Sequence, residues 1–106
     1  MKAAMFLPSA TMANEIAICT LCGDGEILLA AENSHLFLAE SGGPAIHARA
    51  LCRPVPTTTG IFTSDDVKQY NSWRKIYRHP ITKMISIENT TNLSGGIPWL
   101  KFVLES

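Results

Sequence analysis

Short apolar runs separated by turn residues dominate the first half of this 106-residue chain. Residues 16–21 and 27–31 flank the tripeptide Gly-Asp-Gly, and glycine supplies the positive φ that a tight hairpin turn requires. Residues 35–40 and 45–52 flank a Ser-Gly-Gly-Pro turn in the same way. The pattern therefore predicts four strands that form two β-hairpins.

One helix is predicted to begin after Thr63 or Ser64 and to run through residue 77 or 78. The side chain of Thr63 or of Ser64 can cap the helix. The next two residues are aspartates, whose negative charge is favourable at the positive end of the helix dipole. The proline at position 80 ends it, because proline cannot continue a helix.

Alternating apolar residues predict two further strands, residues 83–88 and 99–104. Residues 53–60 carry two prolines and three threonines, so we expect an irregular connection there. The order β-β-β-β-α-β-β favours an α+β fold, in which one helix packs on one face of an antiparallel sheet of about six strands, in two layers. The length fits a single domain, residues 1–106, with residues 1–12 as a loosely ordered arm.

The composition adds an expectation about assembly and compartment. Charged residues make up only 17% of the chain, whereas about 25% is typical, and a subunit interface often absorbs such an apolar excess. We therefore expect a homodimer. Three cysteines cannot all pair within the chain, and no apolar run approaches the roughly 20 residues of a membrane span. These features predict a soluble, cytoplasmic protein without a membrane partner.

Charges of opposite sign are separated along the chain. Residues 1–46 contain one basic and five acidic residues, whereas residues 47–106 contain eight basic and four acidic ones. On the predicted helix, the basic face lies opposite the aromatic face. The candidate binding residues are Lys68, Asn71, Arg74, Lys75 and Arg78 of the helix, with Arg49 and Arg53 of the strand before it.

This polarity leads to the main functional hypothesis, a small protein-interaction module that binds an acidic partner through the basic helix face. The alternative is a nucleic-acid-binding regulator that uses the same face, although a pI near 6.8 is low for such proteins. A solvated face without a partner would give the same pattern. A phosphate site is disfavoured because aspartates occupy the only predicted helix N-terminus.

A second alternative is a small-molecule site between the helix and the sheet. The helix face that is predicted to meet the sheet is aromatic, and the last strand adds two more aromatic side chains. The candidate pocket residues are Tyr70, Trp73, Tyr77, Trp99 and Phe102. The same pattern is typical of an ordinary core.

The sequence contains only weak signals for metal binding and for catalysis. Cys19 and Cys22 have the spacing of a zinc knuckle, and His47 and Cys52 could complete four ligands. However, residues five apart on a regular strand point to opposite faces, so small buried thiols are the simpler interpretation. No serine stands in a glycine elbow, and the three histidines lack a partner with diagnostic spacing. We therefore expect no cofactor and lean against an enzyme.

Overall fold

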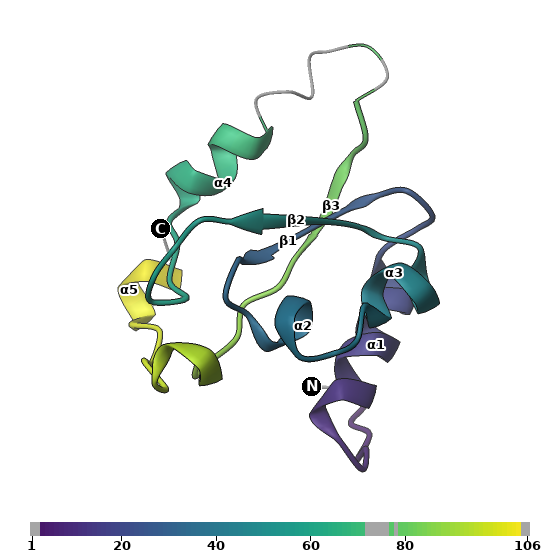
Figure 1. Cartoon of the computed structure of the whole chain (residues 1–106), viewed down its shortest axis with the longest axis horizontal. Coiled ribbons are helices and arrows are strands. Elements are labelled where there is room, and N and C mark those ends of the chain that lie inside the picture. Colours follow the sequence, from purple (N-terminus) through teal and green to yellow (C-terminus); the bar gives the residue numbers. More distant parts are fainter. Residues whose placement is uncertain (1–2, 72–76, 78, 105–106) are drawn as a thin grey trace.

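The structure is a computed structural model that describes residues 3–71, 77 and 79–104. Its central feature is a sheet of three parallel strands in the order β2-β1-β3, with helices on both faces (Figure 1). The elements along the chain are α1 (Ala10–Leu21), β1 (Ile27–Ala31), α2 (His35–Leu38), α3 (Gly43–Ala48), β2 (Leu51–Val55), α4 (Ser64–Asn71), β3 (Thr82–Ile85), the 3-10 helix η2 (Asn92–Ser94) and α5 (Lys101–Leu104).

The predicted α+β fold with an antiparallel sheet is therefore wrong, and the fold is α/β. Of the predicted strands, residues 27–31 are confirmed as β1, but both neighbours of β1 run parallel to it. Every residue of β1 is buried, as expected for a parallel strand covered on both faces. An apolar run of this length is equally compatible with an antiparallel strand, so the run alone did not settle the pairing.

The first predicted strand, residues 16–21, is the second half of α1. Ser9 caps this helix by accepting a hydrogen bond from the N–H of Met12 at 3.1 Å. Ile18 is fully buried whereas Ile16 is exposed, which is the one-sided burial of a helix packed on a sheet. The Gly-Asp-Gly turn consequently joins a helix to a strand.

Three more predicted strands contain helices instead. Residues 35–40 contain α2, residues 45–52 span the end of α3 and the start of β2, and residues 99–104 contain α5. Local alternation misled the assignment in these short segments, where one or two helical turns pack apolar side chains as well as a strand does. The predicted strand at 83–88 is shifted, since β3 ends at Ile85.

The proline-rich segment is partly regular, because Pro54 lies within β2. β2 is an edge strand of the sheet. Proline is tolerated in an edge strand because the backbone groups on its outer side have no partner strand, so the missing N–H breaks no hydrogen bond. The predicted helix start is confirmed at Ser64, and Thr63 and Asp66 bond reciprocally around it. Its predicted extension through residues 72–76 and 78 lies outside the described residues.

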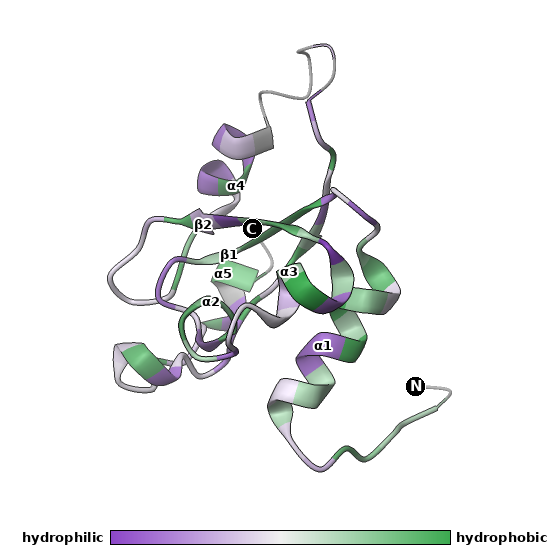
Figure 2. Ribbon diagram, turned by 45° about the vertical axis from the view of Figure 1, so that its right-hand side comes forward, coloured by the Kyte–Doolittle hydropathy of each residue, from purple (hydrophilic) through white to green (hydrophobic). Residues whose placement is uncertain are grey.

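Two hydrophobic clusters lie on opposite faces of the sheet. Leu28 points into one cluster and Leu29 into the other, as successive strand residues must. Figure 2 shows the hydrophobic β1 between the helices. One cluster contains Ile18, Cys22, Leu28, Leu36, Ala48 and Ala50, and the other contains Ile27, Leu29, Ala31, Val55, Phe62 and Trp99. The molecule therefore has three layers, with α1 to α3 on one face and α4 and α5 on the other.

The strand order creates a topological switch point. The chain leaves β1 toward β2 on one side and then crosses to β3 on the other side. The loops after β1 and β3 therefore diverge and leave a crevice at the carboxyl ends of the strands, where ligands of open α/β sheets bind. No helix within the described ranges is long and apolar enough to cross a membrane.

Candidate active site

A cavity of about 290 Å³ lies at this switch point. Three segments distant in sequence form its wall: the first turns of α1, the loop and helix after β1, and the loop after β3. The lining residues are Ala10, Asn14, Ser34, His35, Leu36, Ser86, Glu88 and Asn92. Most of them are polar, which distinguishes this cavity from an ordinary gap in the core.

Ala10, the first residue of α1, lines the cavity. The first turn of this helix contains no acidic residue, and within the described residues the N–H groups of Ala10 and Thr11 donate no hydrogen bond. Free N–H groups and the positive end of the helix dipole together attract an anion such as a phosphate. A phosphate site was disfavoured because aspartates occupy the only helix N-terminus that the sequence predicted. That argument does not apply to α1, a helix that the sequence did not predict.

Glu88 fixes the two loops that border the crevice. Its Oε2 accepts a hydrogen bond from the N–H of His35 at 2.8 Å, and its Oε1 accepts one from the N–H of Asn92 at 2.9 Å. The carboxylate thereby joins the start of α2 to the loop after β3. This link holds the opposite walls of the cavity at a set distance.

Ser34 and His35 supply reactive groups on the wall that follows β1. Ser34 is 3% exposed, and its hydroxyl has no hydrogen-bond partner within the described residues. The His35 ring is partly exposed, and its Nδ1 lies 3.0 Å from Oε1 of Glu40. A carboxylate can only accept, so the proton of neutral His35 resides on Nδ1 and Nε2 remains a proton acceptor.

Two carboxyl groups, those of Glu40 and Glu15, lie behind this histidine. Glu40 also accepts a hydrogen bond from the Nδ2 of Asn14 at 2.7 Å, and its side chain is fully buried. Glu15, one residue after Asn14, has both carboxyl oxygens buried. Burial raises the pKa of Glu15, and the neighbouring carboxyl group of Glu40 raises that pKa further, whereas His47 opposes the shift.

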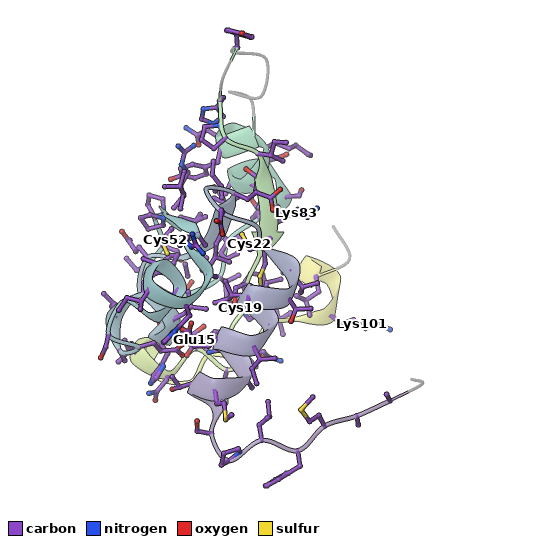
Figure 3. All side chains as sticks on the ribbon, turned by 90° about the vertical axis from the view of Figure 1, so that its right-hand side faces the viewer. Glu15, Cys19, Cys22, Cys52, Lys83 and Lys101 are labelled. Atoms are coloured by element: carbon purple, nitrogen blue, oxygen red, sulfur yellow. The ribbon has the colours of Figure 1, made fainter. Side chains whose placement is uncertain are left out.

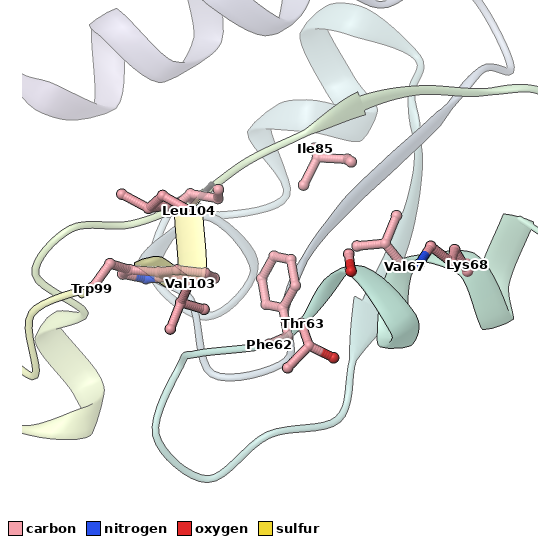
Figure 4. A pocket seen from close by; sticks show the side chains of 10 residues that line it. Phe62, Thr63, Val67, Lys68, Ile85, Trp99, Val103 and Leu104 are labelled. Carbon is pink, nitrogen blue, oxygen red and sulfur yellow. The ribbon is translucent and has the colours of Figure 1, made fainter. Parts of the chain in front are cut away.

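A separate, apolar hollow of about 320 Å³ lies beneath α4. Figure 4 shows Phe62, Val67 and Trp99 among the side chains around it. Phe62 and Trp99 meet edge to face, with ring centroids 5.1 Å apart. Of the predicted pocket residues, Trp99 lines this hollow, while Tyr70 packs against the neighbouring cluster. The side chain of Tyr77 is exposed, and Trp73 and the Phe102 side chain lie outside the described residues.

The candidate basic residues are dispersed. Lys68 pairs with Asp65 at 2.8 Å on the surface of α4, and Arg49 pairs with Asp24 at 3.2 Å where α3 ends. Arg53 lies on β2 beside a surface hollow that it shares with Tyr70. Asn71 is the last residue of α4, and Arg74, Lys75 and Arg78 lie outside the described residues.

Figure 3 labels three of the weak metal candidates, Cys19, Cys22 and Cys52. Cys19 and Cys22 lie at the end of α1, where Cys19 is exposed and Cys22 is buried, while Cys52 lies on β2 and His47 on α3. Burial raises the pKa of both Cys22 and Cys52. Over the described ranges, no group of three or more His, Cys, Asp or Glu side chains is arranged to hold a metal ion.

Lysines lie away from the cavity in the described part of the chain. Lys83 is an exposed residue of β3, and Lys101 begins α5. Neither they nor Lys68 is among the residues that line the cavity at the switch point. The described wall therefore offers an anion site, an imidazole and hydroxyl groups, but no primary amine.

An α/β sheet with a polar crevice and an open helix N-terminus at its switch point is typical of enzymes that bind phosphorylated cofactors. The sequence profile of the beta-eliminating lyase family matches residues 1–105, so the chain belongs to that family. It is 32% identical over 100 residues to a probable low-specificity L-threonine aldolase 2 of Arabidopsis thaliana, covering 90% of this chain and 28% of that protein.

Two further relatives have the same described activity. Identity is 33% over 92 residues with the low specificity L-threonine aldolase of Escherichia coli K12, covering 86% of this chain and 27% of that protein. It is 37% over 93 residues with the low-specificity L-threonine aldolase of Candida albicans, covering 83% of this chain and 25% of that protein. The chain thus spans about a quarter of the length of these relatives.

Family membership contradicts the predicted interaction module, together with its nucleic-acid alternative. The sequence analysis overlooked every residue of the cavity wall except His35, which it treated as a base without a partner. One signal was available: Ser9 is a typical N-cap residue, and the segment after it contains three alanines, the residue with the highest helix propensity. A helix there would have produced a helix-strand alternation and hence a parallel sheet.

Proposed function

We propose that this chain forms the phosphate- and ring-binding wall of a pyridoxal phosphate site in an enzyme that cleaves β-hydroxy amino acids such as threonine. The observation that carries this proposal is the cavity at the switch point, whose wall includes Ala10 at the N-terminus of α1. Membership of the beta-eliminating lyase family and similarity to threonine aldolases support the same assignment.

The residues present fit the phosphate and the ring of this cofactor. The N–H group of Ala10, the first residue of α1 and part of the cavity wall, suits a phosphate. The imidazole of His35 offers a flat face for stacking of an aromatic ring. The unpartnered hydroxyl of Ser34 is a buried polar group, and such groups are normally satisfied by a ligand or water.

The aldehyde end of the cofactor needs a lysine amine, which the described cavity wall lacks. The relatives are about four times longer than the matched segment, so in a complete enzyme this amine would come from another segment. When bound, the cofactor withdraws electrons from the amino acid and stabilises the carbanion left by bond cleavage.

Residues of this chain would act on the proton of the substrate hydroxyl. Aldol cleavage breaks the bond between Cα and Cβ and requires removal of that proton. Nε2 of His35 is a proton acceptor on the cavity wall, held in place through Nδ1 by Glu40 and through its backbone by Glu88. His35 is therefore our candidate general base.

Cofactor binding can be tested with pyridoxine 5′-phosphate, which has the ring and the phosphate but no aldehyde and so cannot react with surface lysines. Titration into the ¹⁵N-labelled chain should shift the amide signals of Ala10, Thr11 and His35. Pyridoxine without the phosphate should bind much more weakly. Equal binding of the two compounds, or shifts confined to other residues, would contradict the proposed site.

Two histidine variants give a matched comparison. His35→Ala should weaken binding of pyridoxine 5′-phosphate several-fold, whereas His47→Ala should leave it unchanged, because His47 is exposed on α3 and lines a different hollow. The reaction is tested by adding pyridoxal phosphate and threonine and measuring acetaldehyde. Release no faster than with the free cofactor would contradict the proposed activity and leave the binding result standing.

A further inference from the structure

A buried pair of carboxyl groups lies between α1, α2 and α3, behind the wall of the cavity. Glu40 belongs to the turn between α2 and α3, and its side chain has no exposed surface. Its Oε1 accepts hydrogen bonds from the side-chain amide of Asn14 and from Nδ1 of His35. Within the described residues, no group donates a hydrogen bond to Oε2. One half of this carboxylate is therefore satisfied and the other half is not.

Glu15 completes the pair from α1. Both of its oxygens are buried and lack a donor within the described residues. Its carboxyl group packs against Gly43 at the start of α3, where a Cβ would overlap Oε1 and the carboxyl carbon. Figure 3 shows Glu15 on the side of α1 that faces the other helices. Gly43 thus leaves room for this side chain, which cannot turn outward without losing that packing.

Two ionised carboxylates in this position would be costly. Three buried oxygens would lack a donor, and two interacting like charges cannot both be ionised there without a large penalty. A single proton removes both problems, because a protonated carboxyl group donates one hydrogen bond. The raised pKa of Glu15 agrees with this location for the proton.

The charged and titratable neighbours come from every packed element. His35 faces Glu40 from α2, His47 acts on Glu15 from α3, and Cys52 of β2 lies close enough to interact with Glu15 electrostatically. Only the two histidines can carry positive charge, and His35 binds the opposite oxygen of Glu40. Neither histidine replaces the missing donor between the two carboxyl groups.

We propose that Glu15 and Glu40 share one proton, with the Glu15 hydroxyl donating to Oε2 of Glu40, and that the pair positions His35 with its proton on Nδ1 and a bare Nε2 toward the cavity. Glu15 and Glu40 are thus positioning residues that act through His35. The consequence for catalysis rests on the proposed function, whereas the shared proton and the histidine tautomer do not.

The proposal can be tested by NMR on the unliganded chain. With ¹³C-labelled glutamate, one carboxyl signal should titrate well above the ordinary range of glutamates, and Glu15→Gln should remove that titration. With ¹⁵N-labelled histidine, wild-type His35 should show a proton on Nδ1. Glu15→Gln should preserve this tautomer, because the glutamine amide can also donate to Glu40.

Glu40→Leu should have a different effect. The raised pKa of Glu15 should fall, because the charge of Glu40 and its hydrogen bond are lost, and His35 should populate the tautomer with its proton on Nε2, because Nδ1 has no acceptor left. Asp24→Asn removes an exposed carboxylate and should change neither signal. The wild-type titration decides the first half of the proposal even if Glu40→Leu does not fold.

Two results would overturn the proposal. The shared proton is excluded if all glutamates of the wild-type chain titrate together in their ordinary range. The positioning role is excluded if a folded Glu40→Leu variant, which lacks any acceptor for the Nδ1 proton, keeps His35 in the wild-type tautomer. Because no cofactor is added, a failure of pyridoxine 5′-phosphate to bind would contradict the proposed function without touching either result.

Discussion

Gly60→Ala should destabilise the chain far more than the same substitution at another glycine with positive φ. Gly60 is buried with φ of +81°, and a Cβ there would lie 2.7 Å from the Cβ of Thr91 and closer still to its Oγ1 and Cγ2. Thr91 is fully buried, and its hydroxyl donates to the carbonyl oxygen of Glu88 at 3.0 Å. The added methyl group therefore has no free space to enter.

Two contributions determine the magnitude. The left-handed conformation costs a non-glycine residue about 1–2 kcal/mol, and overpacking a well-filled site adds about 1–3 kcal/mol. We expect Gly60→Ala to lower the free energy of unfolding by about 2–5 kcal/mol, a large part of the ~5–15 kcal/mol of a typical domain. Gly25→Ala isolates the first contribution, because Gly25 has φ of +74° and no neighbour within 4 Å of its added Cβ.

Urea unfolding of the two variants and the wild type measures the difference. The double variant Gly60→Ala with Thr91→Ala should recover part of the overpacking contribution. In Gly60→Ala, the amide signal of His35 should also shift, because displacement of Thr91 moves Glu88, which accepts that N–H. Equal destabilisation by Gly60→Ala and Gly25→Ala would refute the close packing of these two loops.

Four other substitutions test local statements. Ser9→Ala should cost about 1 kcal/mol in urea unfolding through the lost cap of α1. Phe62→Ala should cost about 3–5 kcal/mol by emptying the site beside Trp99. The pKa of Glu15 is raised in the folded state. The free energy of unfolding of the wild type, measured with urea, should therefore fall as the pH rises from the unfolded pKa to the folded pKa. Glu15→Gln should flatten this dependence. Hydrogen bonds from Thr63 lower the pKa of Asp66 in the folded state. Asp66 therefore contributes to stability above its unfolded pKa, and this contribution is lost as the pH falls through the folded pKa. In Asp66→Asn this part of the loss of stability in acid should be absent.

The sequence indicates the buried strand and the capped start of α4 but not the sheet. Residues 27–31 are apolar throughout, and Thr63 with Asp66 forms a local capping pattern, so both follow from neighbouring residues. Parallel pairing depends on partners more than 20 residues away, which no local pattern specifies. The predicted homodimer stays a prediction.

The candidate site was hidden for the same reason. Ala10, His35 and Glu88 lie far apart in the sequence, and each has an ordinary local role as a helix residue, a helix start or a loop acid. The pairing of β1 with β3 brings the segments of His35 and Glu88 together, and the packing of α1 on the sheet adds Ala10. The histidine could be recognised as a base once Glu40 and Glu88 were seen to hold it, and those contacts depend on the tertiary structure.

The register of β3 connects the fold to the site in one further step. While β1 advances from Ile27 to Leu28, the partner on β3 advances from Thr82 to Met84, so one extra residue is inserted at Lys83. Met84 then packs beside the cluster of Leu28, and the strand continues in phase to the loop that carries Glu88. Loss of this residue would reverse the faces of the strand beyond it, because side chains alternate with a period of two. It would also draw Glu88 back by roughly 3.3 Å, the rise of one strand residue, which is enough to break both hydrogen bonds that hold the cavity walls together.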